Sequence, residues 1–298
     1  MTPPIQAAQA VTLAFEQLAG SGPATRRIVF LHGMLGRGNN LRTIARRFID
    51  QRPGWDAWLV DLRGHGASPK GSSQPSLGAA AEDVLALCSR SIPIAALVGH
   101  SFGGKVALEA VRRSQIPADG AGPQPLDSLA HVVTLDSNPG VRTPAQVQGP
   151  DSALAVIQML RSLPAQHASR AAFVEAVLAQ GQSRTLAQWL AQSTEPSPSP
   201  AVAGAVRFAL DLDELEALLR SYFAEDLWPL IEAPPAALRV HLVIAGRSTS
   251  YSAEDRQRAQ AAAAQCPRVT CDLLPTDHWV HAEDPEGLLQ RLWTHIPA

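Results

Sequence analysis

The sequence predicts an α/β protein built on a mostly parallel, doubly wound sheet. Strand-like runs alternate with helix-like runs through the first half of the 298 residues, which is typical of parallel sheets with helices on both faces. A long interval, 141–230, interrupts this alternation with helical stretches, and the alternation then resumes. A glycine-flanked serine, Ser101, stands where an apolar run meets a helix-like stretch.

The expected strands are short apolar runs, several of them rich in β-branched residues. They cover residues 11–18, 27–31, 57–61, 94–98, 131–135, 238–245 and 268–273. Helices are expected between them, at residues 39–51, 77–91, 102–114, 253–265 and 285–293. The alternation of the two kinds of segment predicts a single large sheet covered by helices.

The interruption is expected to be a helical cap. Its helical stretches cover residues 153–163, 169–180, 185–192 and 211–223, the last with Asp211 as a potential N-cap. The Pro/Ser-rich stretch 195–200 is expected to be a mobile linker. The chain therefore divides into a core of residues 1–140, a cap of residues 141–230 and a second core segment of residues 231–298.

The pentapeptide Gly99-His100-Ser101-Phe102-Gly103 carries the strongest functional signal. A G-x-S-x-G between a strand and a helix forms a sharp turn that exposes the serine hydroxyl at the carboxyl end of a parallel sheet. The flanking glycines are expected because strand and helix pass too close for side chains. The pattern predicts that Ser101 is a nucleophile, rather than only the N-cap residue of an ordinary helix.

A second segment supplies the expected oxyanion donors. The apolar run 27–31 ends in His32-Gly33-Met34, and a His-Gly loop in this place presents a backbone N–H to a developing oxyanion. We expect one donor from Met34 and the other from Phe102, directly after the nucleophile. Loss of one such donor costs about 10²–10³ in rate. His32 is expected to brace the loop and to transfer no proton.

A general base and an acid complete the expected site. His278 follows the last expected strand, where its loop can reach over the serine turn and accept the hydroxyl proton. Asp136 ends the strand expected beside the serine strand, so both open on the same crevice. Glu254 and Asp255 remain the alternatives for the acid, because they follow the next strand.

In this order, the motifs resemble the α/β-hydrolase superfamily over nearly the whole chain, and within it the small bacterial carboxylesterases and their organellar relatives. The likeness rests on the segments 31–36, 61–68, 99–105 and 278–283. It implies an α/β-hydrolase fold with a helical cap between strands six and seven, and a triad acid after strand six, in support of Asp136. The chain departs from the family at Asp277, where a glycine usually precedes the histidine.

The sequence therefore predicts a serine esterase for carboxylic esters of short or medium acyl chain, with Ser101, Asp136 and His278 as its triad and no cofactor. C–C bond, lactone or amide hydrolysis and a menaquinone-pathway-like elimination use the same scaffold, so they stay open. An anionic substrate of that kind would need arginines in the cap. Those available are Arg142, Arg161, Arg170, Arg184, Arg207 and Arg220. A receptor that binds a ligand under the cap without catalysis is the remaining alternative.

Composition leaves a small-molecule substrate as the expected partner. The formal charge of −2 comes without a basic stripe, which argues against nucleic acid. The sequence contains no run of about 18 apolar residues, the length that membrane insertion requires. Residues 1–9 lack the features of a secretory signal. The three cysteines, Cys88, Cys266 and Cys271, show no paired or metal-type spacing, so we expect reduced thiols in the cytoplasm.

Overall fold

A computed structural model of the chain describes residues 10–89, 91–115, 126–143, 146, 152–198 and 203–298. Its centre is a seven-stranded sheet in the order β1-β3-β2-β4-β5-β8-β9. The strands are β1 Phe15–Leu18, β2 Arg26–Leu31, β3 Trp55–Val60, β4 Ile94–His100, β5 His131–Leu135, β8 Arg239–Ala245 and β9 Val269–Leu274. Strand β1 runs antiparallel to β3, and the other neighbours are parallel.

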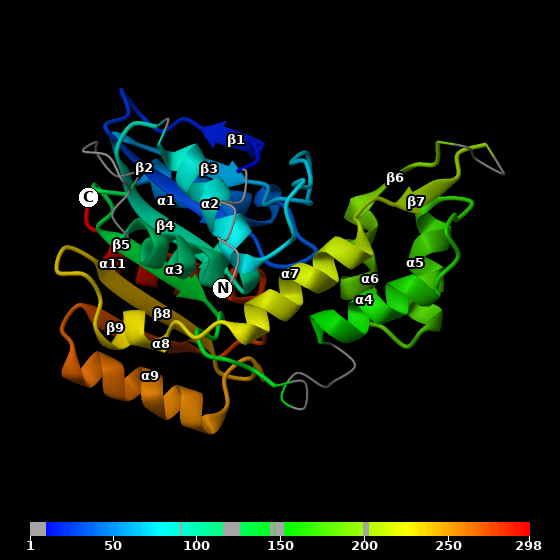
Figure 1. Ribbon diagram of the computed structural model, residues 1–298. Helices are drawn as coiled ribbons and strands as arrows, with labels where there is room; N and C mark the ends of the chain where they lie inside the picture. The colour runs from blue at the N-terminus through cyan, green and yellow to red at the C-terminus, as the bar shows by residue number, and fades with distance from the viewer. Residues whose placement is uncertain (1–9, 90, 116–125, 144–145, 147–151, 199–202) are drawn as a thin grey trace, which may run out of the picture.

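Helices cover both faces of the sheet (Figure 1). Alternate residues of β2 divide between two cores, because successive side chains of a strand point to opposite faces: Ile28 and Phe30 belong to one, Val29 and Leu31 to the other. The first core includes residues of α1 (Arg42–Asp50) and α11 (Pro285–His295), and the second includes residues of α2 (Leu77–Cys88), α3 (Phe102–Ser114) and α9 (Ala253–Gln265). The predicted doubly wound α/β fold is confirmed.

Between β5 and β8 the chain leaves the sheet. This insertion holds α4 (Ala153–Ser162), α5 (Arg170–Ala179), α6 (Arg184–Leu190), η3 (Ala191–Ser193), β6 (Thr194–Pro196), β7 (Val206–Phe208) and α7 (Leu212–Ala224). In Figure 1, α4, α5, α6 and the two short strands lie to one side of the sheet, and α7 runs back toward it. Asp211 caps α7 by accepting the N–H groups of Asp213 and Glu214, as predicted.

The remaining elements are short. Helix α8 (Trp228–Glu232) precedes β8, η1 (Gly38–Leu41) precedes α1, and α10 (Val280–Glu283) precedes α11. No helix in the described part of the chain is long and apolar enough to cross a bilayer.

Three sequence expectations differ from the structure. The first strand begins at Phe15, because the N–H groups of Val11 and Ala14 bond to the side chains of Asp83 and Ser68 instead of a neighbouring strand. The expectation of a mobile linker at residues 195–200 is wrong over its described part, since β6 pairs antiparallel with β7. The insertion follows the fifth of the seven strands, one place earlier than expected. The difference arises because a single strand, β1, precedes β2, the strand that leads into the His-Gly loop.

Some expectations lie outside the described residues. Residues 1–9 and residues 199–200 of the expected linker are among these. The division of the chain into segments at residues 140 and 230 stays a prediction.

Candidate active site

Ser101 occupies a sharp turn between β4 and α3. Its backbone has φ 50° and ψ −116°, a conformation that costs energy for any residue except glycine. The turn is close-packed: a Cβ on Gly99 would lie 2.3 Å from the carbonyl oxygen of Gly103, and a Cβ on Gly103 would lie 2.4 Å from that of Leu31. Both glycines are therefore required by the geometry that exposes the serine.

Backbone strain in the described chain gathers around this turn. The non-glycine residues with positive φ are Leu35 (66°), Ser101 (50°) and Asp136 (45°). They follow β2, β4 and β5, three neighbouring strands whose carboxyl ends meet at one edge of the sheet. Strain of this kind clusters at functional sites, where the surrounding structure holds it in place.

The structure brings Asp136 and His278 together. The Oδ2 atom of Asp136 lies 2.7 Å from Nδ1 of His278, and its Oδ1 atom accepts the N–H of Ala245 at 3.1 Å. Asp136 is 1% exposed, whereas the His278 side chain is 35% exposed. The pair thus joins a buried, fixed acid to a histidine that still reaches the surface of the site.

Asp136 stays ionised in this position. Burial alone would raise its pKa, but hydrogen bonds from His278, Ser248 and the Ala245 N–H together lower it. An ionised carboxylate accepts hydrogen bonds only, so Nδ1 of His278 donates to it, and in the neutral ring with this tautomer Nε2 is an acceptor. Among the described residues, neither that Nε2 nor Oγ of Ser101 has a hydrogen-bond partner.

Sequence reasoning missed two serines in this network. Oγ of Ser250 lies 3.1 Å from Nδ1 of His278 and 3.0 Å from Oγ of Ser248, which in turn bonds to Asp136. Both serines stand on the loop after β8, and no motif in the sequence marks them. The Ser250 hydroxyl contacts the His278 ring at Nδ1, the nitrogen that faces Asp136, and Ser248 contacts the carboxylate.

His100, within the turn, contacts His278. Its Nε2 donates to the carbonyl oxygen of His278 at 2.8 Å, and the two rings lie 4.7 Å apart between centroids. The ring of His281 lies 4.8 Å from that of His100 on another side. Burial lowers the pKa of His100 well below its usual range, and lowers that of His281 to about 4, so both are neutral near pH 7.

The alternative acids lie elsewhere. Asp255 closes a capping box at the start of α9, where it accepts from Ser252 and from Asn138. Glu254 stands in the first turn of the same helix. Asp277 points to Arg247 at 3.4 Å. None of these carboxylates contacts the His278 ring.

Two buried histidines shape the loop after β2. Nε2 of His32 accepts the N–H of Leu62 at 2.9 Å, and its Nδ1 donates to the Gly33 carbonyl at 2.8 Å. Nε2 of His65 accepts the N–H of Leu35 at 3.1 Å. Burial lowers the pKa of both rings, to about 4 for His65, so both remain neutral and can accept these bonds.

This loop lies against Ser101. A Cβ on Gly33 would lie 3.2 Å from Cβ of Ser101, so the loop and the serine turn are in contact. The N–H groups of Met34 and Phe102 donate to no acceptor in the described part of the chain. The N–H of Phe102 also belongs to the first turn of α3, whose N–H groups lack intrahelical partners.

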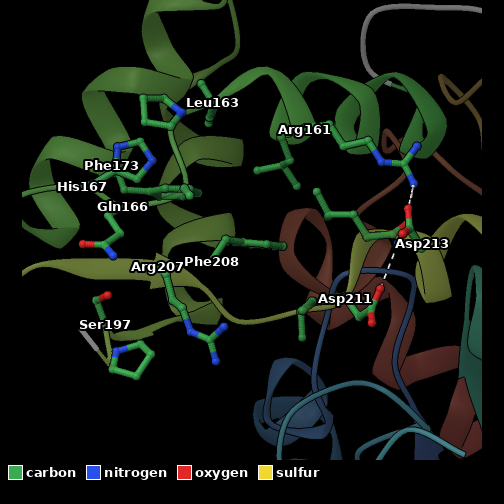
Figure 2. A pocket seen from close by; sticks show the side chains of 16 residues that line it. Arg161, Leu163, Gln166, His167, Phe173, Ser197, Arg207, Phe208, Asp211 and Asp213 are labelled. Atoms are coloured by element: carbon green, nitrogen blue, oxygen red, sulfur yellow. Dashed lines mark hydrogen bonds and ion pairs between the residues drawn. The ribbon is translucent and has the colours of Figure 1, made fainter. Parts of the chain in front are cut away.

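The insertion and the site each border a cavity. One of about 600 Å³ lies within the insertion, where Figure 2 shows Phe173, Phe208 and Leu163 beside Arg161 and Arg207; none of the predicted triad or oxyanion residues lines it. The other, of about 470 Å³, borders the site through Trp279 and His281 and extends to Trp189 of α6. We find no group of three or more metal-ligating side chains in the described residues.

The aromatic residues in and near the insertion fall into separate groups. Trp189 meets Trp279 edge to face at 4.6 Å, directly beside His278. Phe208 stacks on Phe173 inside the insertion, while Trp228 is buried under Arg258 of α9.

Comparisons with known proteins agree with this architecture. A profile of the Alpha/beta hydrolase family matches residues 28–291. The sequence is 26% identical over 274 residues to Esterase YbfF of Escherichia coli, covering 90% of this chain and 92% of that one. It is 25% identical over 300 residues to sn-1-specific diacylglycerol lipase ABHD11 of Danio rerio, covering 98% and 84% of the two chains.

Solved structures share the fold. A marine microorganism esterase superimposes with a TM-score of 0.75 at 20% identity, over 96% of this chain and 100% of that one. E-2-(acetamidomethylene)succinate hydrolase superimposes with a TM-score of 0.70 at 20% identity, over 98% and 99% of the two chains.

Proposed function

The chain belongs to the α/β-hydrolase family, and from that premise we propose that it is a serine esterase that cleaves carboxylic esters of short or medium acyl chain. Full-length similarity to proteins named esterase and lipase supports a hydrolase of this kind. The finer proposal concerns the bond that is cleaved, the acyl chain and the residues that act.

The observation that carries the proposal is the 2.7 Å contact between buried Asp136 and His278. It leaves Nε2 of His278 as an acceptor at the same edge of the sheet as the strained turn of Ser101. An acid, an oriented histidine and a partly exposed serine at three strand ends are what nucleophilic attack on an acyl carbon needs.

In the proposed reaction, Oγ of Ser101 attacks the ester carbonyl while Nε2 of His278 takes the hydroxyl proton. The resulting imidazolium faces the ionised Asp136, which stabilises its charge. The N–H groups of Met34 and Phe102 hold the oxyanion. His278 then returns the proton to the leaving alcohol, and water, activated by the same histidine, releases the acid from Ser101.

The charges of the insertion favour a neutral ester over an anionic substrate. Four of the six arginines considered there are paired with carboxylates of the insertion: Arg161 with Asp213 and Glu216, Arg184 with Glu175, Arg207 with Glu195 and Arg220 with Glu216. Arg142 and Arg170 bond instead to a carbonyl oxygen and to a hydroxyl, respectively. A carboxylate-bearing substrate would have to displace these partners.

The test is a series of p-nitrophenyl esters from acetate to decanoate, set beside a matched series of p-nitroanilides. We expect ester turnover with an optimum at or below about eight carbons and much slower amide turnover. Turnover of the amides alone, or of neither series while Ser101 reacts with a fluorophosphonate, would reject the esterase proposal.

A further inference from the structure

Lys105 is a fully buried lysine that takes no part in the proposed chemistry. It stands on α3, three residues after Phe102, and is 0% exposed. Its Nζ donates to the carbonyl oxygens of Gly140 at 2.8 Å and of Tyr222 at 2.6 Å, and it lies 4.7 Å from the centre of the Tyr222 ring. A buried ammonium group persists only with such partners, and here two carbonyls and a ring face supply them.

The two carbonyls belong to the two segments that connect the insertion to the sheet. Gly140 follows β5, where the chain leaves the sheet, and Tyr222 lies in the last turn of α7, where it returns. The last four carbonyls of a helix lack intrahelical partners, and a cation there is favourable. Lys105 therefore bonds the carboxyl end of α7 and the outgoing segment at the same time.

These connecting segments are also bonded to each other. The N–H of Arg142 donates to the Phe223 carbonyl at 2.9 Å, and the N–H of Leu227 donates to the Pro139 carbonyl at 2.8 Å. The pair therefore forms one unit, and Lys105 fastens that unit to the helix that begins directly after Ser101.

The same contacts reach the catalytic end of α3. The Tyr222 ring lies 6.0 Å from the ring of Phe102, whose N–H is one of the two proposed oxyanion donors. A shift of α7 would consequently press on the residue next to the nucleophile.

Several charges surround the amine. Burial lowers the pKa of Lys105 to about 7, against the raising effect of Asp226 and Glu225 beyond α7 and of Glu109 on α3, while Arg142 of the outgoing segment lowers it further. A neutral amine keeps two N–H groups, so both carbonyl bonds survive deprotonation and only the attraction to the ring and the helix end is lost.

We propose that Lys105 is a positioning residue that fixes the two connecting segments of the insertion against the nucleophile helix and thereby sets how long an acyl chain the site accepts. The proposal rests on the esterase function proposed above. Lys105 acts through Gly140 and Tyr222 and touches no substrate. Its loss frees the insertion to shift relative to Ser101, which changes the binding of long chains more than the chemistry on short ones.

The test compares wild type with K105M and K105R on p-nitrophenyl acetate and octanoate. Methionine keeps the length of the side chain and removes its donors, so two buried carbonyls lose their partner. We expect K105M to raise KM for octanoate about tenfold, a fold-change that corresponds to about 1.4 kcal/mol, with kcat for acetate little changed. Arginine, which keeps the donors, should restore part of the octanoate affinity.

Lys70 is the matched control because it is the other of the two lysines in the chain. It is 65% exposed and pairs with Asp211 at the start of α7. We expect K70M to match wild type with both esters, since an exposed pair contributes little. Folded K105M with an unchanged octanoate KM, or with acetate and octanoate affected equally, would overturn the proposal.

A measurement on the unaltered protein covers the case in which neither variant folds. Hydrogen exchange at the N–H groups of Arg142 and Leu227 should be as slow as within α3, because Lys105 holds all three segments together. Fast exchange in the two connecting segments, with α3 still protected, would reject the positioning role of Lys105. This readout needs no substrate, so it separates failure of that role from failure of the esterase function.

Discussion

Replacing Asp136 with asparagine removes one negative charge. It also places an N–H donor at a position where the surrounding groups are themselves donors. Three donors face the carboxylate: Nδ1–H of His278 at 2.7 Å, the N–H of Ala245 at 3.1 Å and the hydroxyl of Ser248. His278 and Ala245 donate to different oxygens, and an asparagine has one acceptor oxygen and one donor nitrogen, so it can satisfy only one of these two. If its amide nitrogen faces His278, the ring must carry its proton on Nε2 and can no longer accept one from Ser101.

The expected loss in kcat is about 10⁴, the effect of forcing the wrong tautomer in a serine triad, which corresponds to about 5.5 kcal/mol of activation free energy. The assay is p-nitrophenyl butyrate turnover at pH 8, with folding checked by circular dichroism. Asp255→Asn is the matched control, because Asp255 was the rival acid and should leave kcat unchanged. An Asp136→Asn enzyme that keeps more than about a tenth of wild-type kcat would refute the assignment of the acid.

Three further predictions follow from the contacts. Ser250→Ala should lower kcat by about threefold to tenfold, the value of one neutral hydrogen bond to the His278 ring, in the same ester assay; an unchanged kcat would show that the hydroxyl has no part in the reaction. Burial lowers the pKa of His131 to about 4 and of His241 to about 3. The unfolded chain binds protons at these rings first, so the free energy of unfolding should fall as the pH drops below about 6.5, by about 1–2 kcal/mol per histidine at pH 5; urea midpoints at pH 7 and 5 measure it, and equal midpoints would contradict it. Arg63→Met should destabilise the fold by about 3–5 kcal/mol, because it leaves buried Asp83 without the guanidinium that meets it at 2.6 and 2.8 Å; a loss under about 1 kcal/mol in urea unfolding would show that the pair is not needed.

The fold and the residues of the candidate site could largely be predicted because each leaves a local pattern. A β-branched run marks a strand, and the glycines around Ser101 mark a turn that no other residue fits. Asp136 and His278 were found because both follow strands whose ends meet at one edge of the sheet. The structure adds the contact between them, which no local pattern contains.

The remainder depends on contacts between distant segments. Ser250 belongs to a loop without a carboxylate, so nothing in the sequence separates it from an ordinary surface serine. The stretch 195–198 is rich in proline, yet residues 194–196 pair with 206–208 as a short hairpin. Lys105 lies next to a glycine pair in a helix, and only its contacts with Gly140 and Tyr222 distinguish it from a surface lysine.

Labelling with a fluorophosphonate tests the central claim most directly, because the probe reacts with an activated serine whatever its natural ester. The wild-type protein should take up one probe per chain on the peptide that contains Ser101, and Ser101→Ala should take up none. Absence of labelling in folded wild type, or equal labelling of Ser101→Ala, would contradict the assignment of Ser101 as the nucleophile.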